Sequence, residues 1–434
     1  PTAPSIHTIA PYPGSIQNNN KHPLTIELVD GVNDVNDASI VVLVDGVAVT
    51  PTLTNAGDVT KLSYLPVTNG GTWAGGNHTV SLTYATTPAT VSRTETWSFS
   101  AAGVTYSWEG GGTDPDNITD PTNWLNDIAP PNDGTNINLP SGQIINFATN
   151  NLTIPDSSGR QINLAAGAQI VSDKGGGGDL RVNARVNAQG LGPDGNGSFY
   201  VEGGGWGMPN NFTLVGNTTT TANGNRLRMN DGANRLDLAG FTMTTKGNNE
   251  NNFVNTNIVG TAGSRMVLQN FTAFEGATRV DPNVTVEMAT GVTLSSWGGQ
   301  GARRDMAVVL NNNSALETRY DDDDLTFSGP VTVATGNTGI LRAQIGNNGP
   351  ADGDLRLNIL GPLTGAGTFR KDGAGTLLLS GAGTNTGGLI INGANATVLA
   401  SDAAAGTGPI TVSAAATLAF TNGGGQEFVD SAGR

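Results

Sequence analysis

The sharpest chemical feature of the sequence is a run of four adjacent carboxylates, Asp321, Asp322, Asp323 and Asp324. Neighbouring carboxylates repel one another, and a bound Ca²⁺ relieves that repulsion because it takes several oxygen ligands. The competing interpretation is a solvated loop between two strands. No glycine-patterned calcium loop surrounds the run, so the solvated loop is favoured and calcium is kept as the one candidate cofactor. The same interpretation applies to a weaker acidic cluster: Asp114, Asp116 and Asp120.

Residue types that commonly carry out catalysis are sparse. His occurs only at positions 7, 22 and 78, and Cys is absent. A Ser-His-Asp triad, a His-based zinc site and a thiolate nucleophile are therefore excluded from most of the chain. The glycine runs lack the Lys-Ser/Thr pair of a phosphate-binding loop. We expect no catalytic and no cofactor-binding residues, and we predict that the chain is not an enzyme.

One enzymatic alternative stays open, namely a β-helix that binds or cleaves acidic polysaccharides. Such a lyase uses Lys or Arg as the base and calcium to neutralise charge, and Arg303 and Arg304 lie close to the acidic run. A groove lined by Trp206, Trp297, Arg303 and carboxylates would favour this alternative. The commoner interpretation is that both arginines are exposed and solvate a loop.

The charge balance excludes one class of partner. The chain has 36 acidic and 21 basic residues, which gives a formal net charge of −15. Nucleic acid is excluded, because no stripe of Lys and Arg exists to replace phosphate counterions. The acidic balance favours a soluble, self-repelling surface or carboxylates that hold cations. No stretch is long and apolar enough to cross a bilayer as a helix, so we predict no transmembrane segment.

The elements that must position these residues are short strands with a regular repeat. In residues 355–420, Thr376 follows Leu355, Leu389 follows Thr368 and Ile410 follows Leu389, each at a spacing of 21. A fixed period of this length is typical of a solenoid, in which each coil buries its apolar face only by stacking on its neighbours. Short Val, Ile, Thr and Leu runs separated by Gly, Asn, Asp and Ser predict an all-β chain.

Three parts are predicted along the chain. Residues 1–102 show strands around 24–28, 39–44, 79–84 and 96–99 with turn residues between them, which favours an immunoglobulin-like β-sandwich. Residues 103–140 form a junction marked by Trp108 and Trp124, which we expect to cover the open end of a solenoid. The alternative for these two tryptophans is a sugar-stacking platform. Residues 141–434 are predicted to form a long parallel β-helix.

Residues 363–393 carry a family resemblance. The segments Leu363–Phe369, Gly373–Gly381 and Thr384–Gly393 resemble the autotransporter-associated β-strand repeat, and the upstream tryptophans resemble the segment that often opens such proteins. The resemblance implies a right-handed parallel β-helix, export, and a place at the cell surface or in the extracellular space. It implies no activity. Residues 1–102 similarly resemble bacterial immunoglobulin-like domains, on the opening Pro11–Gly14, the Ala38–Gly46 strand and Gly76–Val80.

Two classes of function remain. We expect an extracellular structural protein, a subunit of a surface fibre, filament or adhesive stalk assembled head to tail through strand addition or solenoid ends. The polysaccharide-active β-helix is the alternative, with cell-surface glycans as partners. The leader Pro1–Gln17 and the tail Thr421–Arg434 are the expected docking segments of a homo-oligomer or filament. Because the chain begins at Pro1 without a signal peptide, we also expect a processed mature form.

Overall fold

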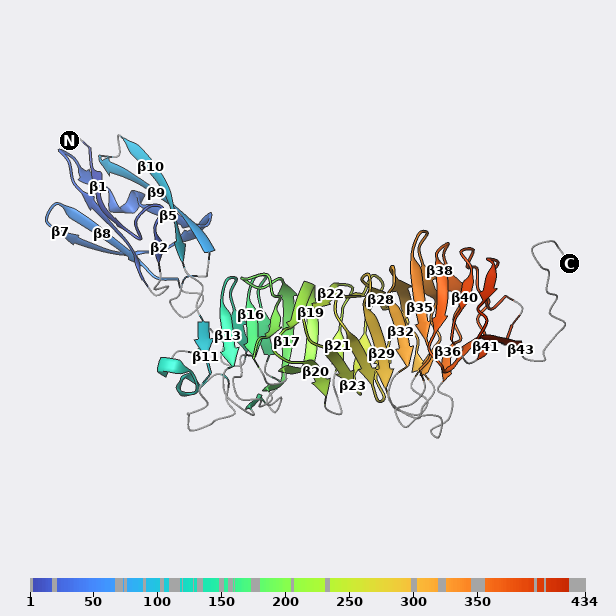
Figure 1. Ribbon diagram of the computed structural model, residues 1–434. Coiled ribbons are helices and arrows are strands. Elements are labelled where there is room, and N and C mark those ends of the chain that lie inside the picture. The colour runs from blue at the N-terminus through green and yellow to red at the C-terminus, as the bar shows by residue number, and fades with distance from the viewer. Residues whose placement is uncertain are drawn as a thin grey trace. The chain divides into compact units, whose positions relative to one another are not determined.

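The computed structural model is an all-β fold with a β-solenoid and antiparallel sheets at its N-terminal side (Figure 1). Two compact units divide the chain, residues 1–146 with 162–170 and 192–195, and residues 147–161, 171–191 and 196–434. The structure describes residues 3–17, 22–66, 73, 76–88, 91–101, 105–108, 118, 120–127, 129–130, 136–147, 152–154, 159, 161–172, 180–203, 207–230, 235–297, 303–318, 325–344, 356–393, 396–401 and 403–420.

Antiparallel strands occupy the first hundred residues and form two sheets. The first sheet has the order β1 (Ser5–Ala10), β3 (Leu24–Val29), β8 (Val59–Tyr64) and β7 (Thr52–Ala56). The second has the order β2 (Ile16–Gln17), β10 (Ser92–Ala101), β9 (Gly76–Thr87), β5 (Val41–Val44) and β6 (Val47–Val49), with β4 (Asp34–Val35) also on β9 and a 3₁₀ turn, η1 (Asp37–Ser39), before β5. All four predicted strands are confirmed.

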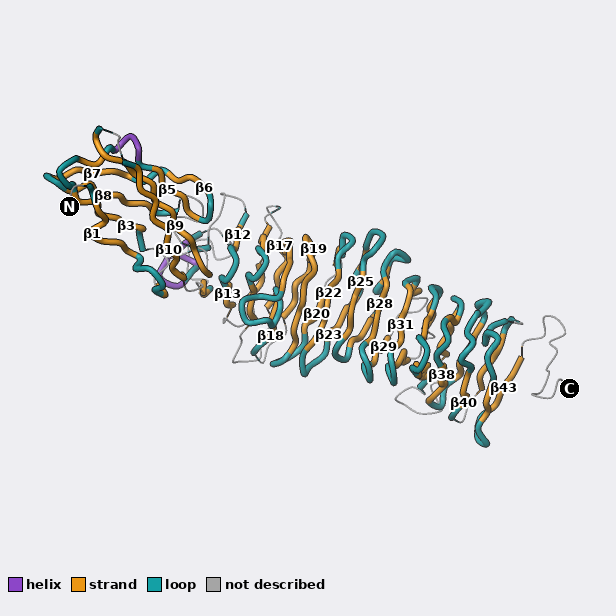
Figure 2. Tube along the Cα trace, turned by 90° about the horizontal axis from the view of Figure 1, so that it is seen from above, coloured by secondary structure: helices purple, strands orange, loops and turns teal. Residues whose placement is uncertain are grey.

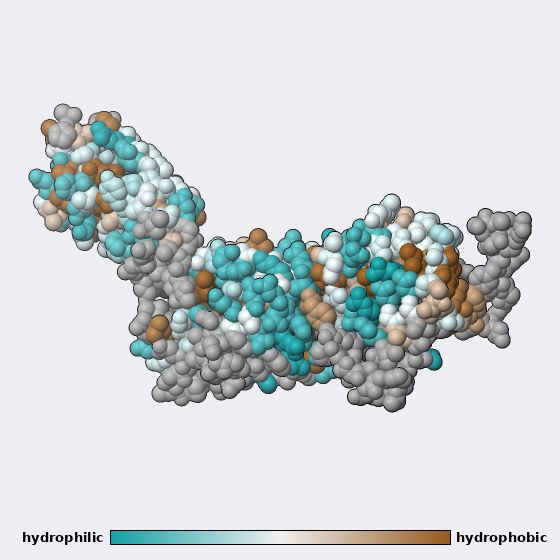
Figure 3. All heavy atoms as spheres, in the orientation of Figure 1, coloured by the Kyte–Doolittle hydropathy of each residue, from teal (hydrophilic) through white to brown (hydrophobic). Residues whose placement is uncertain are grey.

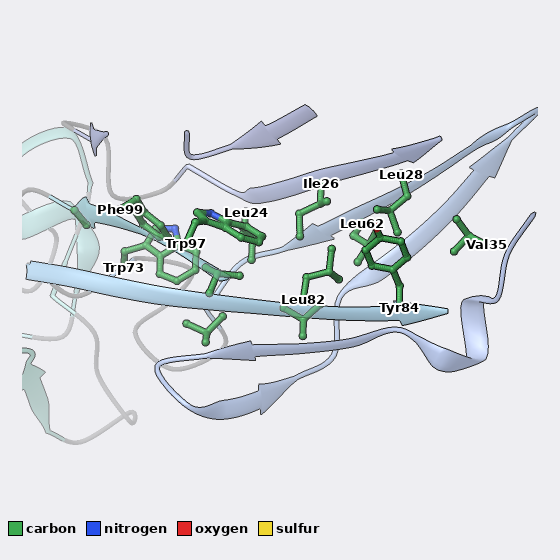
Figure 4. Close-up of a cluster of buried hydrophobic side chains, with 14 residues drawn as sticks. Leu24, Ile26, Leu28, Val35, Leu62, Trp73, Leu82, Tyr84, Trp97 and Phe99 are labelled. Carbon is green, nitrogen blue, oxygen red and sulfur yellow. The ribbon is translucent and has the colours of Figure 1, made fainter. Parts of the chain in front are cut away.

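The apolar core of this part is built by strand alternation. Leu24, Ile26 and Leu28 on β3 are buried at every second position, and β9 and β10 supply the facing side chains (Figure 4). Trp73 packs edge-on against Phe99, with ring centroids 5.0 Å apart. The leader residues 5–10 and 16–17 form β1 and β2 inside these sheets, so their predicted role as a free docking segment is wrong.

The solenoid is a parallel coil of about ten turns (Figure 2), with three strands in most turns and two in the last turns. Through its middle, each strand pairs in parallel with the third strand after it, as β22 does with β25 and β25 with β28. The handedness stays a prediction of the resemblance, and the domain boundaries at residues 102 and 140 stay predictions from the sequence pattern. Two short 3₁₀ turns, η2 (Pro121–Asn123) and η3 (Leu125–Asp127), precede the regular coils.

The three faces of the coil are named here by the order in which a turn visits them. Face one holds β11 (Thr105–Ser107), β13 (Ile144–Phe147), β16 (Gln169–Ser172), β18 (Phe199–Val201), β22 (Thr242–Lys246), β25 (Arg265–Leu268), β28 (Thr285–Met288), β31 (Ala307–Leu310), β34 (Val331–Val333) and β37 (Leu363–Thr364).

Face two holds β14 (Leu152–Ile154), β20 (Leu227–Asn230), β23 (Asn251–Val254), β26 (Thr272–Glu275), β29 (Thr293–Trp297), β32 (Ala315–Thr318), β35 (Thr338–Arg342), β38 (Thr368–Asp372), β40 (Leu389–Ile391) and β42 (Ile410–Val412). The long strands β17 (Leu180–Gly190) and β19 (Gly207–Ala222) run across more than one face.

Face three holds β12 (Ile137–Leu139), β15 (Gln161–Leu164), β21 (Arg235–Asp237), β24 (Asn257–Val259), β27 (Arg279–Val280), β30 (Arg303–Arg304), β33 (Leu325–Phe327), β36 (Arg356–Ile359), β39 (Thr376–Leu379), β41 (Ala396–Leu399) and β43 (Thr417–Phe420). The last six of these strands form a separate sheet.

Stacked apolar side chains hold the coils together. On face one, every member of one in-register column is at most 2% exposed. Burying each such side chain contributes about 1.5–3 kcal/mol, so the column stabilises the stack well beyond any single coil. The column is Met243, Met266, Val286, Val308, Val331 and Leu363.

The predicted repeat is correct in kind but not in register. Leu377 pairs with Leu357 and Thr397 with Leu377, both at a spacing of 20, whereas Leu418 follows Thr397 at a spacing of 21. A one-residue slip turns a side chain to the other face of a strand, so the coils absorb the difference in their turns. The predicted spacing of 21 is confirmed from Leu389 to Ile410. It is wrong from Leu355 to Thr376 and from Thr368 to Leu389, because Thr376 pairs with Arg356 and Leu389 with Phe369, each at a spacing of 20.

Candidate docking site at the C-terminal coil

The candidate site is the last described coil, which consists of β42, β43 and the residues around them. In the described part of the chain, β42 is the last strand of the face-two sheet and β43 the last strand of the face-three sheet. Outermost strands present backbone N–H and C=O groups along one side, which is a template for further strand pairing. Among the described residues, the outer edges of β42 and β43 are therefore available for strand pairing.

Core-facing side chains become exposed at this coil. Ile391 is fully buried on β40, and its in-register successor Val412 is 42% exposed. Leu399 is 5% exposed on β41, and its successor Phe420 is 36% exposed. A strand added to either sheet would bury these side chains, at a gain of about 1–2 kcal/mol each.

The coil is also free of charge. No Asp, Glu, Lys or Arg lies in residues 403–420, and most side chains there are Ala, Ser, Thr or Gly. Brown, apolar residues gather at this end of the solenoid on the face shown in Figure 3. In a chain of net charge −15, this neutral surface is a place where two acidic molecules can approach without repulsion.

Aromatic rings pack together beside β11, the first strand of face one. Trp108 and Trp124 are 2% and 1% exposed, form an isolated antiparallel bridge and pack edge-on at 5.0 Å between centroids. Trp124 also contacts Tyr106, whose register partner Ile145 opens a core column of face one. The rings lie in the segment predicted to form the lid, and the lid itself stays a prediction. The sugar-stacking platform is wrong for these two residues, because their faces are buried.

The acidic residues singled out in the sequence give no assembled cation site in the described residues. Asp321, Asp322, Asp323 and Asp324 lie outside the described residues, as do Asp114 and Asp116. Asp120 caps η2, where its Oδ1 accepts hydrogen bonds from the Thr122 backbone N–H at 3.0 Å and from Oγ1 at 2.7 Å. No group of three or more metal-ligating acidic or imidazole side chains occurs in the described ranges.

Arg304 does not solvate a loop. It is fully buried on β30, and its guanidinium donates hydrogen bonds to the backbone carbonyls of Thr278 and Gly276 in the preceding coil. Burial lowers the pKa of the Arg304 guanidinium to about 10. The predicted exposed arginine is thus a core residue that ties two coils together. Trp206 lies outside the described residues, and Trp297 and Arg303 lie on β29 and β30.

Sequence reasoning missed a charged strip on face two. Glu275 is 8% exposed and accepts a hydrogen bond from Asn252 at 2.8 Å, with Arg228 Nη2 at 3.6 Å. Glu317 is 7% exposed and is bound by Arg342. The signal in the sequence was a pair of opposite charges one coil apart for Glu317 and Arg342, and two coils apart for Arg228 and Glu275, and it can be recognised only once the irregular coil lengths are known.

Comparisons with known proteins add little to this geometry. No family model matches the chain, and no curated protein matches it. A solved structure that is similar in part is that of CopC from Methylosinus trichosporium OB3b. It shares 13% identity with a TM-score of 0.18, and the match covers 23% of this chain and 92% of that one. This likeness is too weak to carry an argument. Among the described residues, no helix is long and apolar enough to span a membrane.

Proposed function

We propose that this chain is an extracellular structural protein whose stacked coils form a spacer and whose C-terminal coil binds a second copy of the chain. The exposure of core-facing Val412 on a charge-free terminal coil carries this proposal. Parallel coils gain stability by stacking on further coils, so an open coil is a natural contact between copies. Export and a place at the cell surface rest on the repeat resemblance of residues 363–393.

The partner surface in this proposal is the same coil of the second copy. The opposite end of the stack carries the buried rings of Trp108 and Trp124, whereas core-facing side chains are exposed at the C-terminal coil. A contact between two like ends is isologous and closes at a dimer. The proposed contact therefore replaces the head-to-tail arrangement expected from the sequence with an end-to-end arrangement.

The polysaccharide-cleaving alternative is not proposed. A catalytic base must reach the proton it abstracts. Arg304 is fully buried and holds backbone carbonyls, so it does not face a polysaccharide. Calcium binding by the Asp321–Asp324 run is retained as a separate proposal, which the Discussion tests.

Electron microscopy of the purified full chain tests the proposed assembly. Paired solenoids joined through their C-terminal coils are the expected particles. Sedimentation should show a mass that rises with concentration. Single particles at all concentrations would contradict the proposal, as would pairs joined along their sides.

A further inference from the structure

The edge strands of the two N-terminal antiparallel sheets are unequally protected. β2 has two residues and β6 three, and β1 carries a register shift between Ile6 and Thr8. Short length and bulges are two of the devices that keep edges from pairing with other chains. β7 pairs with β8 in unbroken register over five residues, all of them exposed, and contains no Pro and no charge. Its outer edge is therefore open to pairing (Figure 1).

Side chains on the core side of this edge are uncovered. Leu53 lies opposite Leu62, which is 1% exposed, and Val47 lies opposite Val44, which is 9% exposed. Residues directly opposite in an antiparallel pair share a face, so Leu53 and Val47 are on the core side. They are nevertheless 36% and 67% exposed. Because residues 50–51 alone join β6 to β7, the free edges of these two strands lie next to each other. We call this edge, formed by β6 and β7, the seam.

We propose that the seam binds the seam of a second copy, with the two β7 strands antiparallel about Thr54. This surface is distinct from the C-terminal coil and does not depend on the function proposed above. No charged residue lies between Asp45 and Asp58, so pairing of the two β7 strands sets no charged side chains directly opposite one another, and the nearby Asp37 carboxylate accepts a hydrogen bond from Asn55 at 2.6 Å. Antiparallel pairing also separates the two Asp58 carboxylates by a strand length, about 17 Å, which exceeds a Debye length of about 8 Å at physiological salt.

The backbone of β7 suits this pairing. Ala56 and Val59 close a two-residue turn, and a closing pair of this kind exchanges hydrogen bonds. Alternation then turns the N–H and C=O groups of Leu53 and Asn55 toward the free edge. A two-fold axis at Thr54 sets Leu53 opposite Asn55 of the partner subunit. The two Leu53 side chains become diagonal neighbours and cover one another.

Cysteine cross-linking in the full chain tests the register directly, because the native sequence contains no Cys. Thr54→Cys should form a disulfide-linked dimer on mild oxidation, since Thr54 faces its own copy across a narrow pair. Thr52→Cys is the matched control. Residue 52 lies opposite Ala56 of the partner subunit, so two such cysteines are more than a disulfide span apart. Equal cross-linking of both variants, or none with Thr54→Cys, would overturn the proposal.

Sedimentation of a second pair of variants tests the energetics of the same contact. Val412→Lys is used as the background, so that the C-terminal coil does not contribute. In that background, Leu53→Lys should weaken dimer formation at least tenfold, because it sets a charge at the paired edge. Leu360→Lys replaces a Leu of similar exposure on the solenoid and should change nothing. A background chain that stays monomeric, or a Leu53→Lys dimer of unchanged affinity, would contradict the seam contact.

Discussion

Arg342 Nη1 lies 2.5 Å from Oε2 of Glu317, and the two residues are register partners on adjacent coils of face two. The carboxylate side chain is 9% exposed and the guanidinium 29%. Because of this difference in burial, removing one residue of the ion pair should have a different cost from removing the other. Removing Arg342 leaves a charge in a desolvated place, whereas removing Glu317 leaves a charge that still reaches water.

The first prediction follows from that inequality. Arg342→Ala should destabilise the solenoid by about 3–5 kcal/mol, because it leaves the buried Glu317 carboxylate unpaired. Glu317→Gln should cost only about 1 kcal/mol, because the amide still accepts a hydrogen bond. Chemical denaturation of both variants and of the double variant measures the difference. Equal costs for the two single changes would show that the pair is effectively solvent-exposed.

Lys371 gives a pH-dependent prediction. It is fully buried in the column between Leu341 and Ile391, and its Nζ donates a hydrogen bond to the Gly373 carbonyl at 2.7 Å. Burial lowers the pKa of the Lys371 ammonium from its usual value of 10.5. The unfolded chain thus binds this proton more tightly, so stability rises with pH from the folded-state pKa up to about 10.5 and is lowest below that window.

Lys371→Met should remove this dependence. The variant should be at least as stable as the parent at pH 7, because Met suits an apolar column. As pH rises toward 10, the stability of the parent should increase relative to that of the variant. Thermal melts across that pH range measure the gap, which is the difference in melting temperature between the variant and the parent. Lys246→Met is the control at a less buried site, and it should show a constant gap. A gap that does not narrow for Lys371→Met would contradict the burial argument.

The aromatic lid gives a third prediction. Trp124→Ala should cost about 3–5 kcal/mol, because it opens a cavity over Tyr106 at the beginning of the coil stack. Trp124→Phe should recover most of that loss by restoring the ring contact. Denaturation midpoints and the binding of an apolar dye report the opening. A Trp124→Ala variant with unchanged stability would show that the rings do not close the stack.

Calcium binding is tested on the acidic run. If Asp321, Asp322, Asp323 and Asp324 share a Ca²⁺, the ion should raise the melting temperature and a chelator should lower it. Replacing all four with Asn should abolish the response while the melt without calcium is unchanged or raised. An identical melt in calcium and in chelator would remove calcium from the account.

Much of the fold could be predicted because strand alternation and the repeat act locally. Apolar and polar residues alternate from Leu24 to Leu28, and the same residues alternate between buried and half-buried on β3. The strands in residues 363–393 stack in parallel as expected. Register was harder to predict. Pairs such as Phe327 and Ile359 are 32 residues apart, and turn lengths of this kind leave no trace in strand composition.

The location of the candidate site could be predicted from the sequence, but its chemistry could not. A stack with a Trp-marked beginning and no visible cover at its last repeat predicts an open coil, and the exposure of Val412 agrees with that. Arg304 was expected at the surface, because charge alone does not reveal a guanidinium that satisfies carbonyls of the preceding coil. Long-range contacts, here between coils, decide which charged residues are buried.

The central claim is that the charge-free C-terminal coil joins two copies, and one pair of variants tests it most directly. Val412→Lys and Val215→Lys make the same change at valines that are 42% and 45% exposed, the first on β42 and the second on β19. Sedimentation of chains that also carry Leu53→Lys isolates the coil contact from the seam. Val412→Lys should then leave monomers, whereas Val215→Lys should associate like its parent. Association that survives Val412→Lys, or is lost equally in both variants, would contradict the account.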